Sequence, residues 1–138
     1  MRMSYSKQIV MKQSFKPSTY NSVSPYFVVK GAGKFIDFAK EVFDAKELRR
    51  YDLPDGSITH AEVMIDDSVL MVADGNENYP PHQLMIHVYV PDAHATYRKA
   101  IDAGCEAVEE PVQKGDDQDL RGSFKDFAGN FWSVGTQQ

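Results

Sequence analysis

Residues 24–43 read SPYFVVKGAGKFIDFAKEVF, and this stretch decides the fold. The apolar run 26–29 lies between Pro25 and a glycine-containing turn, which is the pattern of a short strand followed by a turn. A helix is predicted after the turn, because the next apolar residues recur on one helical face: Phe35, Ile36, Ala39, Val42 and Phe43. The folded part of the chain is therefore expected to begin with a strand, a turn and an amphipathic helix.

Three more strands are predicted to complete this first unit. Residues 47–51 form a short strand, and a Leu-Pro-Asp-Gly turn at 53–56 leads into an alternating apolar and polar run at 57–65. A tight turn at 66–67 then reverses the chain into a strand at 68–73. Together these elements make one β-α-β-β-β unit.

A second unit is predicted after a linker. The loop 74–82 contains glycine, asparagine and two prolines and is unlike a helix or strand. Residues 84–90 then form a strand, and Asp92 caps a helix that runs to Gly104. Further short strands are predicted at 107–109, 120–125 and 131–135.

The two units look like copies of each other. Superposing Val29 on Val90 also places Ile36 on Tyr97, and an internal repeat is the economical explanation. We predict an α+β fold in which two βαβββ modules form a curved mixed sheet cup with the helices on its outer face.

A single domain is predicted over residues 23–137, with module one at about 24–75 and module two at about 82–136. Residues 1–22 are rich in Ser, Lys, Gln and Tyr and lack sustained periodicity, apart from a strand candidate at 9–11. We predict that they form an N-terminal arm, which either lies on a partner subunit or is disordered.

Composition excludes several classes of function. With 15 Lys and Arg against 20 Asp and Glu, the net charge of -5 leaves no basic patch for nucleic acid. No apolar run approaches the ~20 residues of a membrane span, and the start lacks the apolar core of a secretion signal. Cys105 is the single cysteine and has no partner for an intramolecular disulfide, so a cytoplasmic location is expected.

Alternation divides each strand between two faces. The even-numbered residues of 84–90 are all apolar and are predicted to pack under a helix. In the run 60–65, His60 and Glu62 are predicted to lie on the face away from the helices, whereas Trp132 is predicted to point toward the helix layer. The uncovered face of each sheet becomes a cup, which is a natural site for a small molecule.

Five segments, in this order, carry a resemblance to a known family: 24–32, 36–38, 55–63, 67–74 and 126–132. Together they resemble the PhnB-like branch of the glyoxalase/bleomycin-resistance/dioxygenase group, the vicinal oxygen chelate superfamily, over nearly everything from Ser22 to Gln137. The resemblance implies a cup built from βαβββ repeats, usually completed in a homodimer.

The resemblance also implies where a metal is bound in the metal-dependent members, at the first and last strands of each unit. Here those places are held by Ser24 or Pro25, Met71, Met85 and Ser133. Thioether and hydroxyl groups are poor ligands for the divalent ions of such enzymes, which prefer imidazole and carboxylate. We therefore expect no metal and no other cofactor.

Two positions depart from the family pattern. Phe127 stands where the closing turn of the family carries a proline, and Arg121-Gly122 replaces an aromatic-glycine pair. Arg121 either attracts an anionic ligand or is a solvated surface arginine.

The predicted ligand-binding residues share the cup face: Tyr26, His60, Glu62, Met71, Met85, His87, Tyr89, Arg121 and Ser133. The leading hypothesis is a metal-free small-molecule-binding protein, or an enzyme whose reaction the sequence does not name. In it, His60 and Glu62 are the polar anchors and the candidate general base and acid. The alternative for this pair is a solvated strand surface without a function.

Two other functions stay open at this stage. His60, Glu62 and His87 could form a displaced metal site of a lyase, isomerase or dioxygenase, because imidazole and carboxylate suit zinc, nickel or iron. Alternatively, the protein sequesters a planar drug-like compound in a dimer groove, and its acidic net charge suits a cationic guest.

Overall fold

The computed structural model describes residues 14–138, so the strand candidate at 9–11 lies outside the described residues. Ten elements follow one another along the chain: β1 (Tyr26–Val29), α1 (Ala32–Phe43), β2 (Lys46–Asp52), β3 (Ile58–Ile65), β4 (Ser68–Asp74), β5 (Met85–Tyr89), α2 (Ala93–Asp102), β6 (Glu106–Val112), β7 (Asp119–Lys125) and β8 (Phe131–Gln137). Neither helix in this part of the chain is long and apolar enough to cross a membrane.

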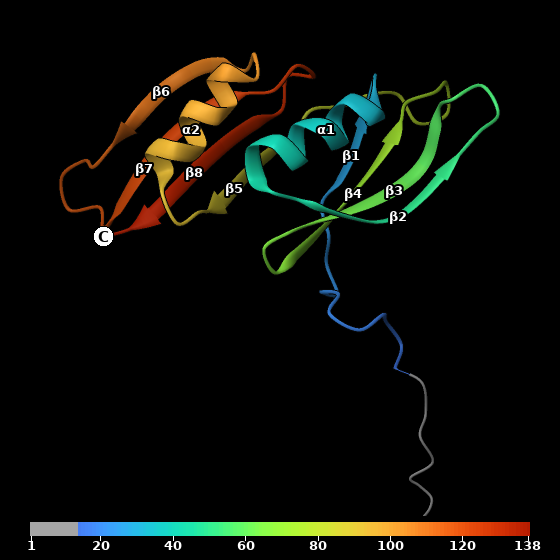
Figure 1. Ribbon diagram of the computed structural model, residues 1–138, viewed down its shortest axis with the longest axis horizontal. Coiled ribbons are helices and arrows are strands. Elements are labelled where there is room, and N and C mark those ends of the chain that lie inside the picture. The colour runs from blue at the N-terminus through green and yellow to red at the C-terminus, as the bar shows by residue number, and fades with distance from the viewer. Residues whose placement is uncertain (1–13) are drawn as a thin grey trace, which may run out of the picture.

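The strands form two four-stranded sheets of identical topology. Their orders are β1-β4-β3-β2 and β5-β8-β7-β6. In each sheet the first and last strands of the module pair in parallel, and the remaining pairs are antiparallel. Figure 1 shows the sheets side by side, with α1 packed on the first and α2 on the second. The predicted α+β fold of two βαβββ modules is confirmed.

A single aromatic cluster joins the two modules. Trp132 of β8 is fully buried and stacks on Phe27 of β1, with ring centroids 5.5 Å apart. It also contacts three phenylalanines of α1, namely Phe35, Phe38 and Phe43. The prediction that Trp132 points toward the helix layer is confirmed, and the hydrophobic core extends across both modules.

The two helices begin in different ways. At α2 the Asp92 side chain accepts a hydrogen bond from the Ala95 amide at 3.1 Å, which confirms the predicted cap. At α1 the residue before the helix is Gly31, whose φ of 101° only glycine adopts readily. The carboxylate of Asp74, from the end of β4, accepts from the backbone amides of Gly31 and Ala32. A residue distant in sequence therefore satisfies two backbone amides at the start of α1.

The predicted alternation of 57–65 holds only in part. Ala61, Val63 and Ile65 face the core, and His60 and Glu62 face away from it. Ile58, which strict alternation would place beside His60, is instead buried in the core. The pairing of β2 with β3 shifts register between Tyr51 and Asp52, opposite this point. Such an irregularity inserts an extra residue, so the side chains before it change faces.

Candidate functional site

The cup face of a sheet is defined here as the side away from the helices. In module one, β4 lies between β1 and β3, so Tyr26 pairs with Met71 and Met71 pairs with Glu62. This register brings three of the predicted ligand-binding residues, from three strands, into one row across the sheet. His60 lies two residues before Glu62 on β3 and belongs to the same face.

Three of these side chains form a hydrogen-bonded chain. Glu62 Oε2 lies 2.8 Å from Nε2 of His60, and Nδ1 of His60 lies 2.8 Å from the Tyr26 hydroxyl. An ionised carboxylate can only accept, so Nε2 of a neutral His60 carries the proton and donates it to Glu62. Nδ1 is then an acceptor, and the Tyr26 hydroxyl donates to it.

Glu62 is ionised although it is buried. Its exposed fraction is 3%. Burial by itself raises the pKa of Glu62, but hydrogen bonds from Tyr20 and His60 and the charge of Arg49 outweigh it, and the pKa lies below its ordinary value. The Arg49 Nε atom lies 3.7 Å from Oε1 of Glu62. The sequence alternative of a solvated strand surface therefore does not describe Glu62.

Tyr20 is a site residue that the sequence analysis missed. Its hydroxyl donates to Oε1 of Glu62, and its ring lies 5.5 Å from the Arg49 guanidinium. Because Tyr20 belongs to the segment interpreted as an arm, neither periodicity nor alternation could assign it to the cup. In the described residues this end of the arm lies against the chain's own module one.

A cavity of about 910 Å³ adjoins the chain of hydrogen bonds. Its lining comes from β1, β3, β4, the turn before β3 and the linker after β4: Tyr26, Val28, Leu53, Asp55, Ser57, Ile58, Thr59, Ala73, Asp74, Gly75, Asn76, Tyr79 and His82. We call it the module-one cavity. Its size is within the range of small-molecule sites, and Tyr26 belongs both to its wall and to the chain with His60.

The cup face of module two carries a separate polar group. His87 Nδ1 lies 3.0 Å from the Ser133 hydroxyl, and the Tyr89 hydroxyl donates to Asp119 at 2.6 Å. Burial and the charge of Arg121 lower the pKa of His87, so its imidazole is neutral at pH 7. The His87 ring packs closely over Gly135. A Cβ atom at position 135 would lie 3.0 Å from Cε1 of His87, so a larger residue would collide with the ring.

Arg121 does not present a free charge. Its guanidinium donates to Asp117 and to Asp119, both at 2.8 Å. Two carboxylates already surround this cation, so the structure gives no support to the idea that Arg121 attracts an anionic ligand.

The predicted site residues therefore divide into two groups. Tyr26, His60, Glu62 and Met71 lie in the first sheet, and Met85, His87, Tyr89, Arg121 and Ser133 lie in the second. Within residues 14–138 no three His, Cys, Asp or Glu side chains gather as a metal site would require. The set His60, Glu62 and His87 is thus not brought together within one chain.

The likeness to known proteins agrees with this architecture. A sequence model of the Glyoxalase/Bleomycin resistance protein/Dioxygenase superfamily matches residues 21–134. The chain belongs to this superfamily. An uncharacterized protein from Mycobacterium bovis is 34% identical over 128 residues, covering 83% of this chain and 82% of that protein.

Solved structures share the superfamily fold at low sequence identity. TioX from Micromonospora sp. ML1 has a TM-score of 0.68 at 20% identity, covering 84% of this chain and 96% of that one. The fosfomycin resistance protein FosX from Listeria monocytogenes, in a complex with Mn(II) and sulfate, has a TM-score of 0.66 at 12% identity, covering 86% and 90%. At these identities the likeness shows the fold alone.

The residues present do not fit a divalent metal such as the Mn(II) of the FosX complex. The positions that the sequence resemblance assigns to ligands carry Met71, Met85 and Ser133 in this chain. Ser133 is hydrogen-bonded to His87, and Met71 lies between Tyr26 and Glu62 in the register of the sheet. These places therefore lack the imidazole and carboxylate donors that divalent ions prefer.

Proposed function

We propose that this protein is a PhnB-like superfamily member that binds a small molecule in the module-one cavity without a divalent metal. The observation that carries the proposal is the double role of Tyr26. Its ring lines the cavity, and its hydroxyl is held by His60, which is held in turn by the buried Glu62. A mostly apolar cavity with a few rigidly oriented polar groups, of which Tyr26 is one, is the usual design of a small-molecule site.

The anchoring chain is pre-organised, which favours binding. Tyr20 and Arg49 hold Glu62, and Glu62 fixes the tautomer of His60. Burial, followed by the charge of Glu62, raises the pKa of Tyr26, so this hydroxyl keeps its proton at neutral pH. A ligand therefore meets a neutral phenol in one fixed orientation and does not have to order it.

A small-molecule screen tests the proposal. Thermal-shift hits are confirmed by calorimetry on the wild type and on Ala73→Phe, which fills the cavity from β4. Binding should be lost in Ala73→Phe and weakened by roughly 1–3 kcal/mol in His60→Ala and in Glu62→Gln. Hits whose affinity is unchanged in all three variants, with folding verified by circular dichroism, would place binding elsewhere and refute the proposal.

The metal-free part of the proposal is tested separately by elemental analysis of purified protein. We expect zinc, nickel and iron far below one equivalent per chain. Stoichiometric metal that is lost in His60→Ala would overturn this part and favour the metal-dependent lyase, isomerase or dioxygenase.

A second candidate function is proton transfer. It is favoured by the order of the chain, in which a carboxylate, an imidazole and a hydroxyl follow one another from the buried side toward the cavity. In such an arrangement the imidazole takes a proton from the hydroxyl while the carboxylate stabilises the imidazolium. Turnover of a bound compound that stops in His60→Gln, while binding persists, would support an enzyme over a pure binder.

The assembly and location are also part of the proposal. We propose that the protein is a homodimer, because Met85 and Tyr89 on the cup face of module two are 75% and 59% exposed and a second copy would bury them. We also propose a cytoplasmic location, in keeping with the single cysteine of the sequence. Sequestration of a drug-like compound is a variant of the same binding function, supported by the aromatic walls Tyr26 and Tyr79.

A further inference from the structure

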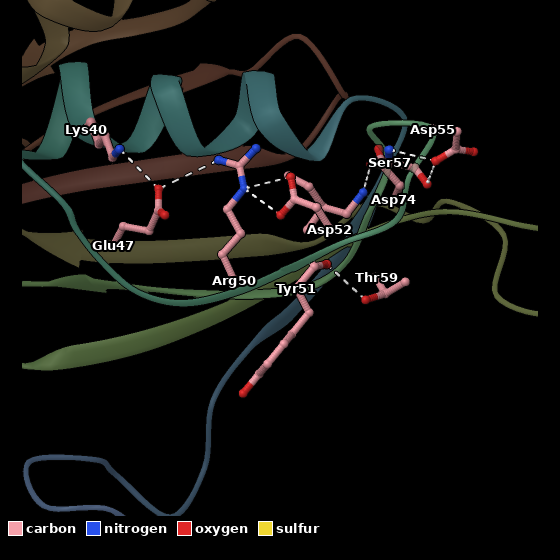
Figure 2. A network of polar contacts seen from close by, with 10 residues as sticks. Lys40, Glu47, Arg50, Tyr51, Asp52, Asp55, Ser57, Thr59 and Asp74 are labelled. Atoms are coloured by element: carbon pink, nitrogen blue, oxygen red, sulfur yellow. Dashed lines mark hydrogen bonds and ion pairs between the residues drawn. The ribbon is translucent and has the colours of Figure 1, made fainter.

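Three hydroxyl groups in the lining of the module-one cavity, those of Tyr26, Ser57 and Thr59, donate their protons to other parts of the protein. Thr59 Oγ1 donates to the backbone carbonyl of Tyr51 at 2.9 Å, and Ser57 Oγ donates to Asp55 at 2.7 Å (Figure 2). A carbonyl and a carboxylate can only accept, so the direction of both bonds is fixed. Toward a ligand these two oxygens offer lone pairs.

The Tyr26 hydroxyl also donates its proton within the protein. Glu62 fixes His60 with its proton on Nε2, so Nδ1 of His60 takes the Tyr26 proton. The phenolic oxygen of this lining residue therefore also offers only lone pairs to a ligand. Three hydroxyls from β1, β3 and the preceding turn thus share one orientation, and a ligand group that only accepts hydrogen bonds could not pair with them.

The charges around the cavity have the matching sign. Two carboxylates line it, and hydrogen bonds from Ser57 lower the pKa of Asp55. Burial opposes the ionisation of Asp74, but bonds from the backbone amides of Ile58, Ala32 and Gly31 outweigh burial and lower its pKa. Among the described residues that line the cavity none is Lys or Arg.

Arg50, the last basic residue of β2 before the turn that lines the cavity, is already paired with carboxylates. Arg50 donates to Asp52 at 3.0 Å and lies 3.7 Å from Glu47, which also binds Lys40 (Figure 2). His82 is the single basic side chain in the described lining. An anionic ligand would therefore meet these three acceptors and two carboxylates without a compensating Lys or Arg in the described lining, which is costly in a partly buried site.

We propose that the module-one cavity binds an apolar molecule that carries a protonated amine. The ammonium group donates to the oxygen atoms of Tyr26, Thr59 and Ser57, and the apolar body lies along Val28, Ile58 and Ala73. This inference rests on the proposed function, because it names the ligand class of the same cavity.

Three probes that share a phenylethyl body and differ in their charged or polar end group test the ligand class: 2-phenylethylamine, 2-phenylethanol and 3-phenylpropionate. Calorimetry at pH 7 with the full chain measures the affinity of each. We expect the amine to bind at least about tenfold more tightly than the carboxylate, with the alcohol between them. Equal or tighter binding of the carboxylate would overturn the ligand class.

Variants locate the binding. Tyr26→Phe keeps the ring and removes the acceptor, so it should lower the affinity for the amine roughly five- to tenfold. Tyr51→Phe is the matched control: Tyr51 stacks near His60 with ring centroids 6.2 Å apart but does not line the cavity, and its change should leave the affinity unaltered. An amine affinity that is equal in the wild type and in Tyr26→Phe would also overturn the inference.

Filling the cavity separates this inference from the proposed function. Ala73→Phe fills it from β4, and Leu53→Trp fills it from the exposed turn in case the first variant folds poorly. Carboxylate binding that both variants abolish would refute the amine class and keep the cavity as the binding site. Binding of none of the three probes, or binding that neither variant affects, would overturn both.

Discussion

At the scale of single residues, Glu62 decides the character of the site. A carboxylate with 3% exposure is expensive to bury unless several donors satisfy it, and here Tyr20, His60 and Arg49 do so. The same hydrogen bonds determine which nitrogen of His60 carries the proton. The direction of the Tyr26 hydrogen bond at the cavity wall is therefore a consequence of one buried charge on β3, two strands away in the sheet.

The first prediction concerns the pH dependence of stability. The pKa of Glu62 in the folded state lies below its ordinary value of 4.5, so the ionised carboxylate stabilises the folded state above that value. Glu62→Gln should lower the free energy of unfolding by about 1–3 kcal/mol at neutral pH. The difference between wild type and variant should shrink as the pH falls from about 4.5 toward the folded-state pKa and below it.

Urea denaturation of both proteins across this pH range provides the measurement. Glu41→Gln, on the exposed side of α1, is the control and should show a small difference from the wild type at every pH. A difference for Glu62→Gln that stays constant down to about pH 3 would mean that the carboxylate is not stabilised by its partners.

At the scale of elements, the turn between β7 and β8 shows how short segments are locked together. Asp126 is buried and accepts from the backbone amides of Ala128 and Asn130 and from the indole of Trp132 at 2.9 Å. The side-chain oxygen of Asn130 accepts in turn from the amide of Leu84, just before β5, at 2.8 Å. One carboxylate thus connects a turn, the core and the first strand of the module.

The second prediction follows from this network. Asp126→Asn replaces an acceptor by an amide whose NH₂ group faces several donors, which leaves buried groups unpaired. We expect a loss of about 2–4 kcal/mol in the free energy of unfolding. Asp116→Asn, in the exposed loop before β7, is the control, and an equal effect of the two changes in urea denaturation would contradict the role of the network.

At the scale of the whole molecule, the modules share one core although their sheets are separate. Trp132 of module two contacts Phe27 of β1 and the phenylalanines of α1, all of which belong to module one. Neither module can bury these rings alone, so we expect the two to unfold together.

The third prediction tests this shared core. Trp132→Ala should cost roughly 3–5 kcal/mol because it leaves a cavity between the modules. Phe15→Ala, which removes a ring that is 89% exposed, should cost little. Because Trp132 is the single tryptophan, its fluorescence reports on the core, and in the wild type this signal should change at the same urea concentration as far-ultraviolet circular dichroism. Separate transitions would show that the modules unfold independently.

The fourth prediction concerns assembly. Light scattering at micromolar concentration should give the mass of a homodimer, and Met85→Glu should shift it toward the monomer because it places a charge on the exposed cup face of module two. Phe127→Glu makes a similar change beside Lys34 at the start of α1 and should leave the mass unaltered. A wild-type monomer would remove the case for a shared cup.

Local sequence determined the architecture of this protein. Helical periodicity at 35–43, the capping residue Asp92 and the side on which Trp132 lies all follow from spacing along a few residues, because helices and strands present side chains at fixed intervals. The repeat of this pattern is sufficient to predict two βαβββ modules.

Only the tertiary structure decided the site. Tyr20 reaches Glu62 across 42 positions of sequence, and Tyr26 reaches His60 across 34. Alternation could place His60 and Glu62 on one face, but it could not show the register irregularity that buries Ile58 or the division of the predicted residues between two sheets. These features depend on which strands become neighbours when the chain folds. The choice of neighbours is determined by burial of the whole core rather than by any local pattern.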